Sequence, residues 1–102
     1  MIDSSLYIRK IPFRYEDTLV LDDITLHPDF TVRHPKTGEY FYWEHFGLMD
    51  DPVYCKNTFS KLQLYSSNNI IPDINLITTY ETKERPLSME KIERIITEYF
   101  IQ

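Results

Sequence analysis

The stretch 26-LHPDFTVRHPKTGEYFYWEHFG-47 decides the fold, because it reads as two extended runs joined by a turn. Within "HPKTG", Pro35 comes early and Gly38 late, an order that suits a four-residue hairpin loop. The run that follows, Glu39 to Phe46, is rich in Tyr, Phe and Trp, which favour strands. The stretch therefore predicts an antiparallel hairpin with one acid inside each of two otherwise apolar, aromatic strands.

The expected register makes these two acids, Asp29 and Glu44, neighbours. With Pro35 to Gly38 as the loop, Arg33 pairs with Tyr40, and counting outward brings Asp29 opposite Glu44. Residues that face each other in an antiparallel pair point to the same side, with Cβ atoms about 4.5 to 5.5 Å apart. Two plainer interpretations stay open: a slip of one residue would reverse Glu44, and acids at strand ends can simply lie in water.

A second turn at Asp22-Asp23 predicts a meander of three strands, since Phe13 to Leu21 before it and Ile24 to Arg33 after it both read as strands. Pairing outward from this two-residue loop brings Glu16 opposite Asp29, so that three acids would line one face. The same registers place these apolar side chains on the other face: Leu19, Leu21, Leu26, Phe30, Val32, Phe41 and Trp43.

Helices and one more strand are expected around the meander, giving an α/β fold. A short helix is expected from Ser4 to Lys10, and Asp51 can cap a second that begins at Pro52 and ends near Ser66. Ile74 to Glu81 is a short apolar strand without alternation, as expected at the centre of a sheet with both faces covered. Ser88 caps "MEKIERIITEYF", whose apolar residues form one buried stripe of a final helix.

Length and composition indicate a globular domain. The chain has 102 residues, of which 42% are hydrophobic and 15% aromatic. We expect residues 1–102 to form a single domain, either alone or as a fragment of a larger protein. No apolar run approaches the roughly 18 to 20 residues that span a bilayer, and the N-terminus lacks signal-peptide features, so the expected location is the cytoplasm, without membrane partners. The single cysteine, Cys55, reads as a packing residue.

A row of facing carboxylates suggests a cation, because like charges across strands destabilise the sheet. Clustered oxygen ligands suit Mg²⁺ or Mn²⁺. Zinc is disfavoured, since the register puts His27 and His45 on opposite faces and no zinc-ligand spacing is present. A Cys/His or Ser/His nucleophilic site stays open, although no nucleophile has a recognisable setting.

The pair "HPDF" and "YWEHFG" resembles the PD-(D/E)XK nuclease superfamily, and more narrowly the restriction-endonuclease-like domains attached to some bacterial helicases. The resemblance covers most of the chain, from Tyr15-Glu16 to the last helix, and the expected order of elements is similar to that superfamily's core. It implies a restriction-endonuclease-like fold with a truncated first helix. It also implies that Asp29 and Glu44 bind Mg²⁺, and that the protein hydrolyses phosphodiester bonds of DNA with metal-activated water.

The sequence departs from the motif in its lysine, which would lie two residues beyond Glu44, where Phe46 stands. Some superfamily members move this group to the following helix, where RecB-like nucleases carry a Q-x-x-x-Y motif. Here "KLQLY" places Lys61 and Tyr65 at i and i+4, on one helix face. The resemblance then gives Lys61 a catalytic role and Tyr65 a contact with the substrate backbone. A solvated lysine and a core tyrosine on an amphipathic helix are the alternative.

Net charge of −5 opposes general binding to nucleic acid, so a DNA partner requires local basic residues. Arg14 together with Lys61 is the favoured choice, because Arg14 is two residues from Glu16 and shares its face if the strand is regular. Two small basic groups are candidates: Arg9, Lys10 and Arg14 before the first strand, and Arg33 and Lys36 near the hairpin turn.

A different class of function is the alternative to a nuclease. The chain would then be a catalytically inactive interaction module, or a domain fragment, that keeps the nuclease fold while other domains of a larger protein supply binding. The acidic balance and the short first helix favour this alternative.

Overall fold

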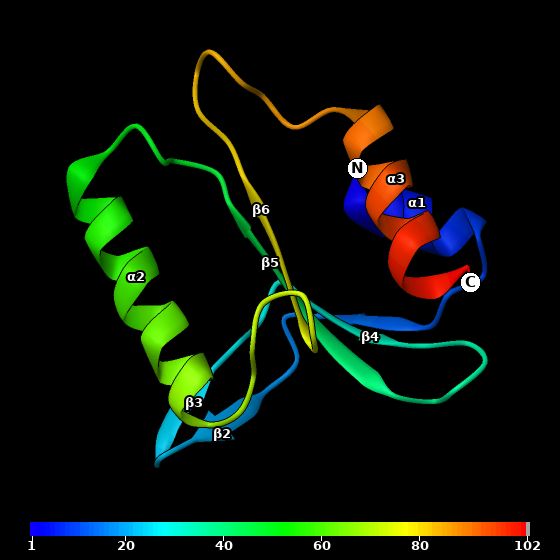
Figure 1. Cartoon of the computed structure of the whole chain (residues 1–102), viewed down its shortest axis with the longest axis horizontal. Coiled ribbons are helices and arrows are strands. Elements are labelled where there is room, and N and C mark those ends of the chain that lie inside the picture. The colour runs from blue at the N-terminus through cyan, green and yellow to red at the C-terminus, as the bar shows by residue number, and fades with distance from the viewer. Residues whose placement is uncertain (102) are drawn as a thin grey trace.

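The computed structural model describes residues 1–101 and is built around a four-stranded mixed sheet in the order β1-β4-β5-β6 (Figure 1). Strands β1, β4 and β5 pair antiparallel, β6 runs parallel to β5, and β2 pairs with β3 in a separate two-stranded sheet. The elements in chain order are α1 (Ile2–Ile8), β1 (Phe13–Tyr15), β2 (Leu19–Leu21), β3 (Ile24–Leu26), β4 (Phe30–Arg33), β5 (Tyr40–Phe46), α2 (Pro52–Ser67), β6 (Leu76–Tyr80) and α3 (Met89–Phe100). The expected α/β class is confirmed.

Helices cover both faces of the four-stranded sheet. Helices α1 and α3 lie side by side on one face, and α2 lies on the other with the β2–β3 hairpin beside its end (Figure 1). We call these the α3 face and the α2 face. The core of the α3 face contains Ile2, Leu6, Ile11, Phe30, Val32, Phe41, Trp43, Ile77, Ile92, Ile96 and Phe100. A smaller core on the α2 face contains Leu21, Tyr65, Ile70 and Leu76.

The expected hairpin registers are confirmed. In the β4–β5 pair Arg33 faces Tyr40 and Phe30 faces Trp43, and the next residues outward, Asp29 and Glu44, are joined by a hydrogen bond. In the β2–β3 pair Leu21 faces Ile24. The turn chemistry and the alternation of apolar residues were therefore sufficient to set the pairing.

The two long strands expected before Arg33 are each broken, which corrects the predicted meander. Strand β1 ends at Tyr15 because Glu16 adopts a left-handed backbone with φ of 50°. The second break falls between β3 and β4 and contains Pro28, which has no N–H to donate to a neighbouring strand.

These breaks redirect the leucines of the β2–β3 hairpin. Leu19, Leu21 and Leu26 pack in the core of the α2 face, beside Tyr65. The prediction that they share a face with Phe30, Val32, Phe41 and Trp43 is therefore wrong. Alternation holds only within an unbroken strand, and each break allows the chain to turn its apolar side toward the other core.

Strand β6 lies at an edge of the sheet, so the prediction of a central strand is wrong. Both of its faces are nevertheless covered, since Leu76 joins the core of the α2 face and Ile77 that of the α3 face. A continuous apolar run reports that both faces are buried, but it carries no information on whether both edges are paired.

The two helix caps expected from the sequence, Asp51 and Ser88, are both present. The carboxylate of Asp51 accepts hydrogen bonds from the backbone N–H groups of Val53 and Tyr54, and the Ser88 hydroxyl accepts one from Lys91. The first helix begins at Ile2, two residues earlier than expected, and ends at Ile8. Within residues 1–101, none of the helices has the length and apolar character required to cross a bilayer.

Candidate active site

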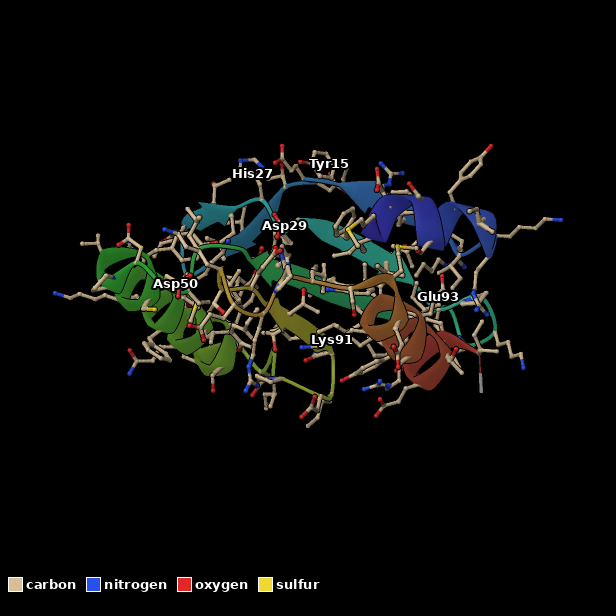
Figure 2. The ribbon with its side chains drawn as sticks, turned by 90° about the horizontal axis from the view of Figure 1, so that it is seen from above. Tyr15, His27, Asp29, Asp50, Lys91 and Glu93 are labelled. Carbon is tan, nitrogen blue, oxygen red and sulfur yellow. The ribbon has the colours of Figure 1, made fainter. Side chains whose placement is uncertain are left out.

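Asp29, Glu44 and Lys61 come together from three different elements. Asp29 directly precedes β4, Glu44 lies in β5, and Lys61 is in the middle of α2. All three line a cavity of about 240 Å³ between the sheet and α2. Figure 2 shows Asp29 near the middle of the molecule, between α2 and the α1–α3 pair. The residues that complete the lining of the cavity are His45, Phe46, Tyr54, Asn57 and Thr58.

Glu44 is a buried carboxylate, with 2% of its surface exposed. Its Oε2 lies 2.5 Å from the Lys61 ammonium and accepts a hydrogen bond of 2.8 Å from the Tyr65 hydroxyl. Its Oε1 accepts one of 3.2 Å from the backbone N–H of Asp29. A buried charge requires such partners, and here every partner is a donor or a cation.

Asp29 is half-buried, and the backbone of β5 holds its carboxylate in place. Its Oδ2 accepts a hydrogen bond of 2.7 Å from the backbone N–H of His45. No hydrogen bond from the described residues reaches its Oδ1. One oxygen of Asp29 thus positions the carboxylate, while the other stays available to a ligand in the cavity.

Lys61 and Tyr65 share a helix face, as their spacing predicts, and both reach Glu44. The lysine side chain is about one-third exposed, whereas Tyr65 is fully buried. Burial, and after it the charge of Glu44, raises the pKa of the Tyr65 hydroxyl, which therefore stays protonated and donates to the carboxylate. Its position is that of a group that holds Glu44 in place, rather than one that contacts a substrate backbone.

Glu16 takes the expected place opposite Asp29 but not the expected environment. Its backbone N–H donates to the Asp29 carbonyl oxygen at 3.1 Å. Its side chain is exposed, and its charge raises the pKa of the adjacent Tyr15 hydroxyl. Within residues 1–101, no three His, Cys, Asp or Glu side chains gather as a group able to hold a metal ion. The structure therefore does not bring Glu16 together with Asp29 and Glu44.

Arg14 lies apart from Lys61. It faces Thr31 across the β1–β4 pair, is largely exposed, and its Nε lies 3.9 Å from an Asp17 carboxylate oxygen. It lines a different depression, which it shares with Arg33. Arg14 shares the α2 face with the cavity that Lys61 lines, but the two residues line different depressions, so the structure does not bring them together as expected.

His45 points to the face opposite Glu44, as expected, and joins a hydrogen-bonded chain. The Trp43 Nε1–H donates to the Thr79 Oγ1 at 3.2 Å, and this Oγ1 lies 2.8 Å from His45 Nδ1. The Glu81 carboxylate can only accept, so His45 Nε2–H donates to its Oε1 at 2.8 Å, and in the neutral ring Nδ1 then accepts from the Thr79 hydroxyl. The hydrogen bond from His45 lowers the pKa of the Glu81 carboxyl.

Sequence reasoning did not identify these partners of His45. Thr79 and Glu81 lie 34 and 36 residues further along the chain, and only the parallel pairing of β5 with β6 brings them beside it. Parallel pairing depends on a long crossover, here through α2, and leaves no local signal in the sequence.

Two carboxylates of this kind suit a hard divalent cation, and a nearby ammonium can stabilise an anionic group. With a divalent cation bound, such groups can assist a reaction at a phosphate or similar anion. Comparison with known proteins adds no identification, because no protein-family model, no curated protein and no solved structure matches this chain.

Proposed function

We propose that this protein is a divalent-metal-dependent phosphodiesterase that hydrolyses DNA, on a core of the restriction-endonuclease-like type. The observation that carries the proposal is the meeting of Asp29, Glu44 and Lys61 at one cavity. One acid directly before β4 and one on β5, with a lysine supplied by the next helix, resemble the PD-(D/E)XK arrangement with its lysine relocated. The order of a helix, an antiparallel hairpin, a second helix and a further strand adds support.

Mg²⁺ or Mn²⁺ fits the donor set of this cavity. Asp29 and Glu44 offer the oxygen ligands that these ions prefer, and Asp29 Oδ1 accepts no hydrogen bond from any described residue. Lys61 already places a positive charge at Glu44, which indicates that this buried carboxylate stabilises a cation. Asp29 and Glu44 would hold the ion, which when bound orients a water molecule and stabilises charge on the phosphate.

The protein's own groups have distinct tasks in this reaction. Lys61, partly exposed at the cavity, would turn its ammonium from Glu44 toward the phosphate and stabilise the charge that develops there. Tyr65 would keep Glu44 in place through its hydroxyl after Lys61 has moved. The backbone N–H of His45 would keep Asp29 oriented.

A non-catalytic module is the second candidate, and one contact favours it. The Lys61 ammonium lies 2.5 Å from Glu44 Oε2 and already occupies a cation position at the buried carboxylate. In that case the ion pair would serve to attach α2 to the sheet, and the fold would act as a binding domain without metal.

Cleavage of DNA under controlled metal supply tests the proposal. Fluorescent single-stranded and double-stranded oligonucleotides are incubated with the purified chain in Mg²⁺, in Mn²⁺ and in EDTA. We expect metal-dependent cleavage that falls at least about a hundredfold in Asp29→Asn. Glu98→Gln, an exposed acid on α3 on the opposite face, is the matched control and should cleave like the wild type.

Two results would overturn the proposal. Cleavage of equal rate in Asp29→Asn would show that the activity does not arise at this site. A folded wild-type chain that cleaves neither substrate with either metal would leave the non-catalytic module as the function.

A further inference from the structure

A second depression lies on the α2 face, over the part of the sheet formed by β1, β4 and β5. It has a volume of about 470 Å³. Two arginines, two tyrosines and a threonine are among the residues that line it: Arg14, Thr31, Arg33, Tyr40 and Tyr42. We call it the Arg–Tyr depression.

Strand register explains why these side chains gather. Arg14 faces Thr31 across β1 and β4, Thr31 faces Tyr42 across β4 and β5, and Arg33 faces Tyr40. Partners in antiparallel pairs point to one side of the sheet, so all five side chains share the α2 face.

The depression shares the α2 face with the candidate active site, although no residue lines both. Asp29 precedes Thr31 by two residues, and Glu44 follows Tyr42 by two. A step of two residues along a strand keeps the face and advances about 6.8 Å. Tyr42 therefore lies one such step from Glu44, on the same face of β5.

The arginines give this surface local positive charge within an acidic chain. Within residues 1–101, Arg33 forms no ion pair, and its guanidinium lies over the hairpin turn, where a Cβ added at Gly38 would be 3.6 Å from Nη2. Among the described residues, Arg14 pairs with Asp17, which also lines the depression, at 3.9 Å, and the Arg14 side chain is 79% exposed. An exposed pair of this kind is weak, so both guanidinium groups can take a phosphate.

The tyrosines give the same surface an aromatic contact. Tyr40 is 58% exposed and lines the depression together with the two arginines. Tyr42 is half-buried against the core of the α2 face, and burial raises the pKa of its hydroxyl. An exposed ring held by a rigid strand, with guanidinium groups around it, is the combination that stacks a base and binds its phosphates.

We propose that the Arg–Tyr depression binds single-stranded nucleic acid on the face of the sheet that carries Glu44; this inference rests on the proposed function and names the form of its substrate. A base must be free of pairing and stacking to lie on Tyr40, and duplex DNA does not present such a base. Arg14 and Arg33 contact the phosphates, and Tyr40 stacks a base.

Binding measured without cleavage tests this assignment. A short fluorescent oligothymidylate and a duplex of equal length are titrated with the full chain in EDTA, and fluorescence anisotropy is followed over a range of salt. We expect the single strand to bind more tightly than the duplex. Tyr40→Ala should weaken this binding at least about fivefold, and Arg33→Gln should lower the slope of log affinity against log salt by about 0.7.

Matched controls lie on α1 and α3, across the sheet. Tyr7→Ala removes a ring that is 78% exposed, and Arg94→Gln removes an exposed guanidinium, so neither should change binding. Tighter binding of the duplex, or equal losses in Tyr40→Ala and Tyr7→Ala, would overturn the assignment. Because metal is absent, a chain that binds the strand through Tyr40 but never cleaves it would keep this inference and reject the proposed hydrolysis.

Discussion

The backbone N–H of Asp29 donates a hydrogen bond of 3.2 Å to Oε1 of Glu44, although the two acids are 15 residues apart. This contact exists because the β4–β5 hairpin has one register, in which Arg33 faces Tyr40 beside the turn. Everything proposed for the site depends on that register.

Two insertions distinguish the loop from the strand. A glycine inserted between Lys36 and Thr37 lengthens the turn and disturbs their backbone hydrogen bonds to His34 Nδ1, at a cost of about 1 kcal/mol. The apolar pattern keeps the register, so stabilisation by Mn²⁺ in thermal unfolding should persist. A glycine inserted between Tyr42 and Trp43 forces a bulge or reverses Glu44, and stabilisation by Mn²⁺ should disappear. Loss of stabilisation from the loop insertion alone would show that the metal does not bind at this register.

Removal of the Lys61 ammonium should destabilise the metal-free protein. Lys61→Met leaves the buried Glu44 without its cation, and we expect the free energy of unfolding to fall by about 3 kcal/mol. Mn²⁺ should then stabilise this variant more than the wild type, because the lysine no longer competes for Glu44. Urea unfolding with and without Mn²⁺ measures both effects.

Lys56→Met, an exposed lysine on the same helix, is the control and should change neither value. An equal response of wild type and Lys61→Met to Mn²⁺ would contradict metal binding at Glu44.

The hydroxyl of Tyr65 should contribute to stability through Glu44. Tyr65→Phe keeps the buried ring and removes the hydrogen bond from the Tyr65 hydroxyl to the Glu44 carboxylate. We expect the free energy of unfolding to fall by about 2 kcal/mol. Tyr99→Phe removes a comparable hydroxyl, which donates to Asp73 at an exposed position, and should cost less than about 1 kcal/mol. Equal losses of unfolding free energy in the two variants, measured by urea unfolding, would mean that the buried Tyr65–Glu44 hydrogen bond stabilises the protein no more than the exposed one.

Much of the site could be predicted because it depends on local signals. The turn "HPKTG" and the alternation around it determine which residues face each other, and this alone makes Asp29 and Glu44 neighbours. The i, i+4 spacing of Lys61 and Tyr65 likewise places them on one face of a helix. That both side chains point at Glu44 required only that α2 pack on the correct side of the sheet.

The remaining features depend on conformations or contacts that the sequence does not signal. A left-handed backbone at a glutamate has no compositional cue, so the break at Glu16 and the separation of its side chain from the site were missed. The edge position of β6, and the partners that it gives His45, follow from parallel pairing between distant segments. Local patterns report burial and turns, while such pairing is decided by the whole fold.

Glu81 should stabilise the protein in a manner that depends on pH. The His45 hydrogen bond, with a second from the Leu87 backbone N–H, lowers the pKa of Glu81 below its usual value near 4.5. A carboxyl whose pKa is lower in the folded state stabilises the fold above its unfolded pKa, and that contribution is lost as pH falls through the folded pKa. Wild type should therefore be more stable than Glu81→Gln at about pH 6, and the difference should be smaller at about pH 3. Glu84→Gln, an exposed acid in the same loop, should show no such difference at either pH. A difference between wild type and Glu81→Gln that is the same at both pH values would refute the assignment.

Direct measurement of Mn²⁺ bound per chain, by electron paramagnetic resonance of the free ion during titration, tests the central claim that Asp29 and Glu44 form a divalent-cation site. We predict that the wild type binds Mn²⁺, that Asp29→Asn does not, and that Glu16→Gln binds like the wild type, since Glu16 is not gathered with the two acids. A wild-type chain that leaves Mn²⁺ free, or an Asp29→Asn variant that binds it equally well, would contradict the claim.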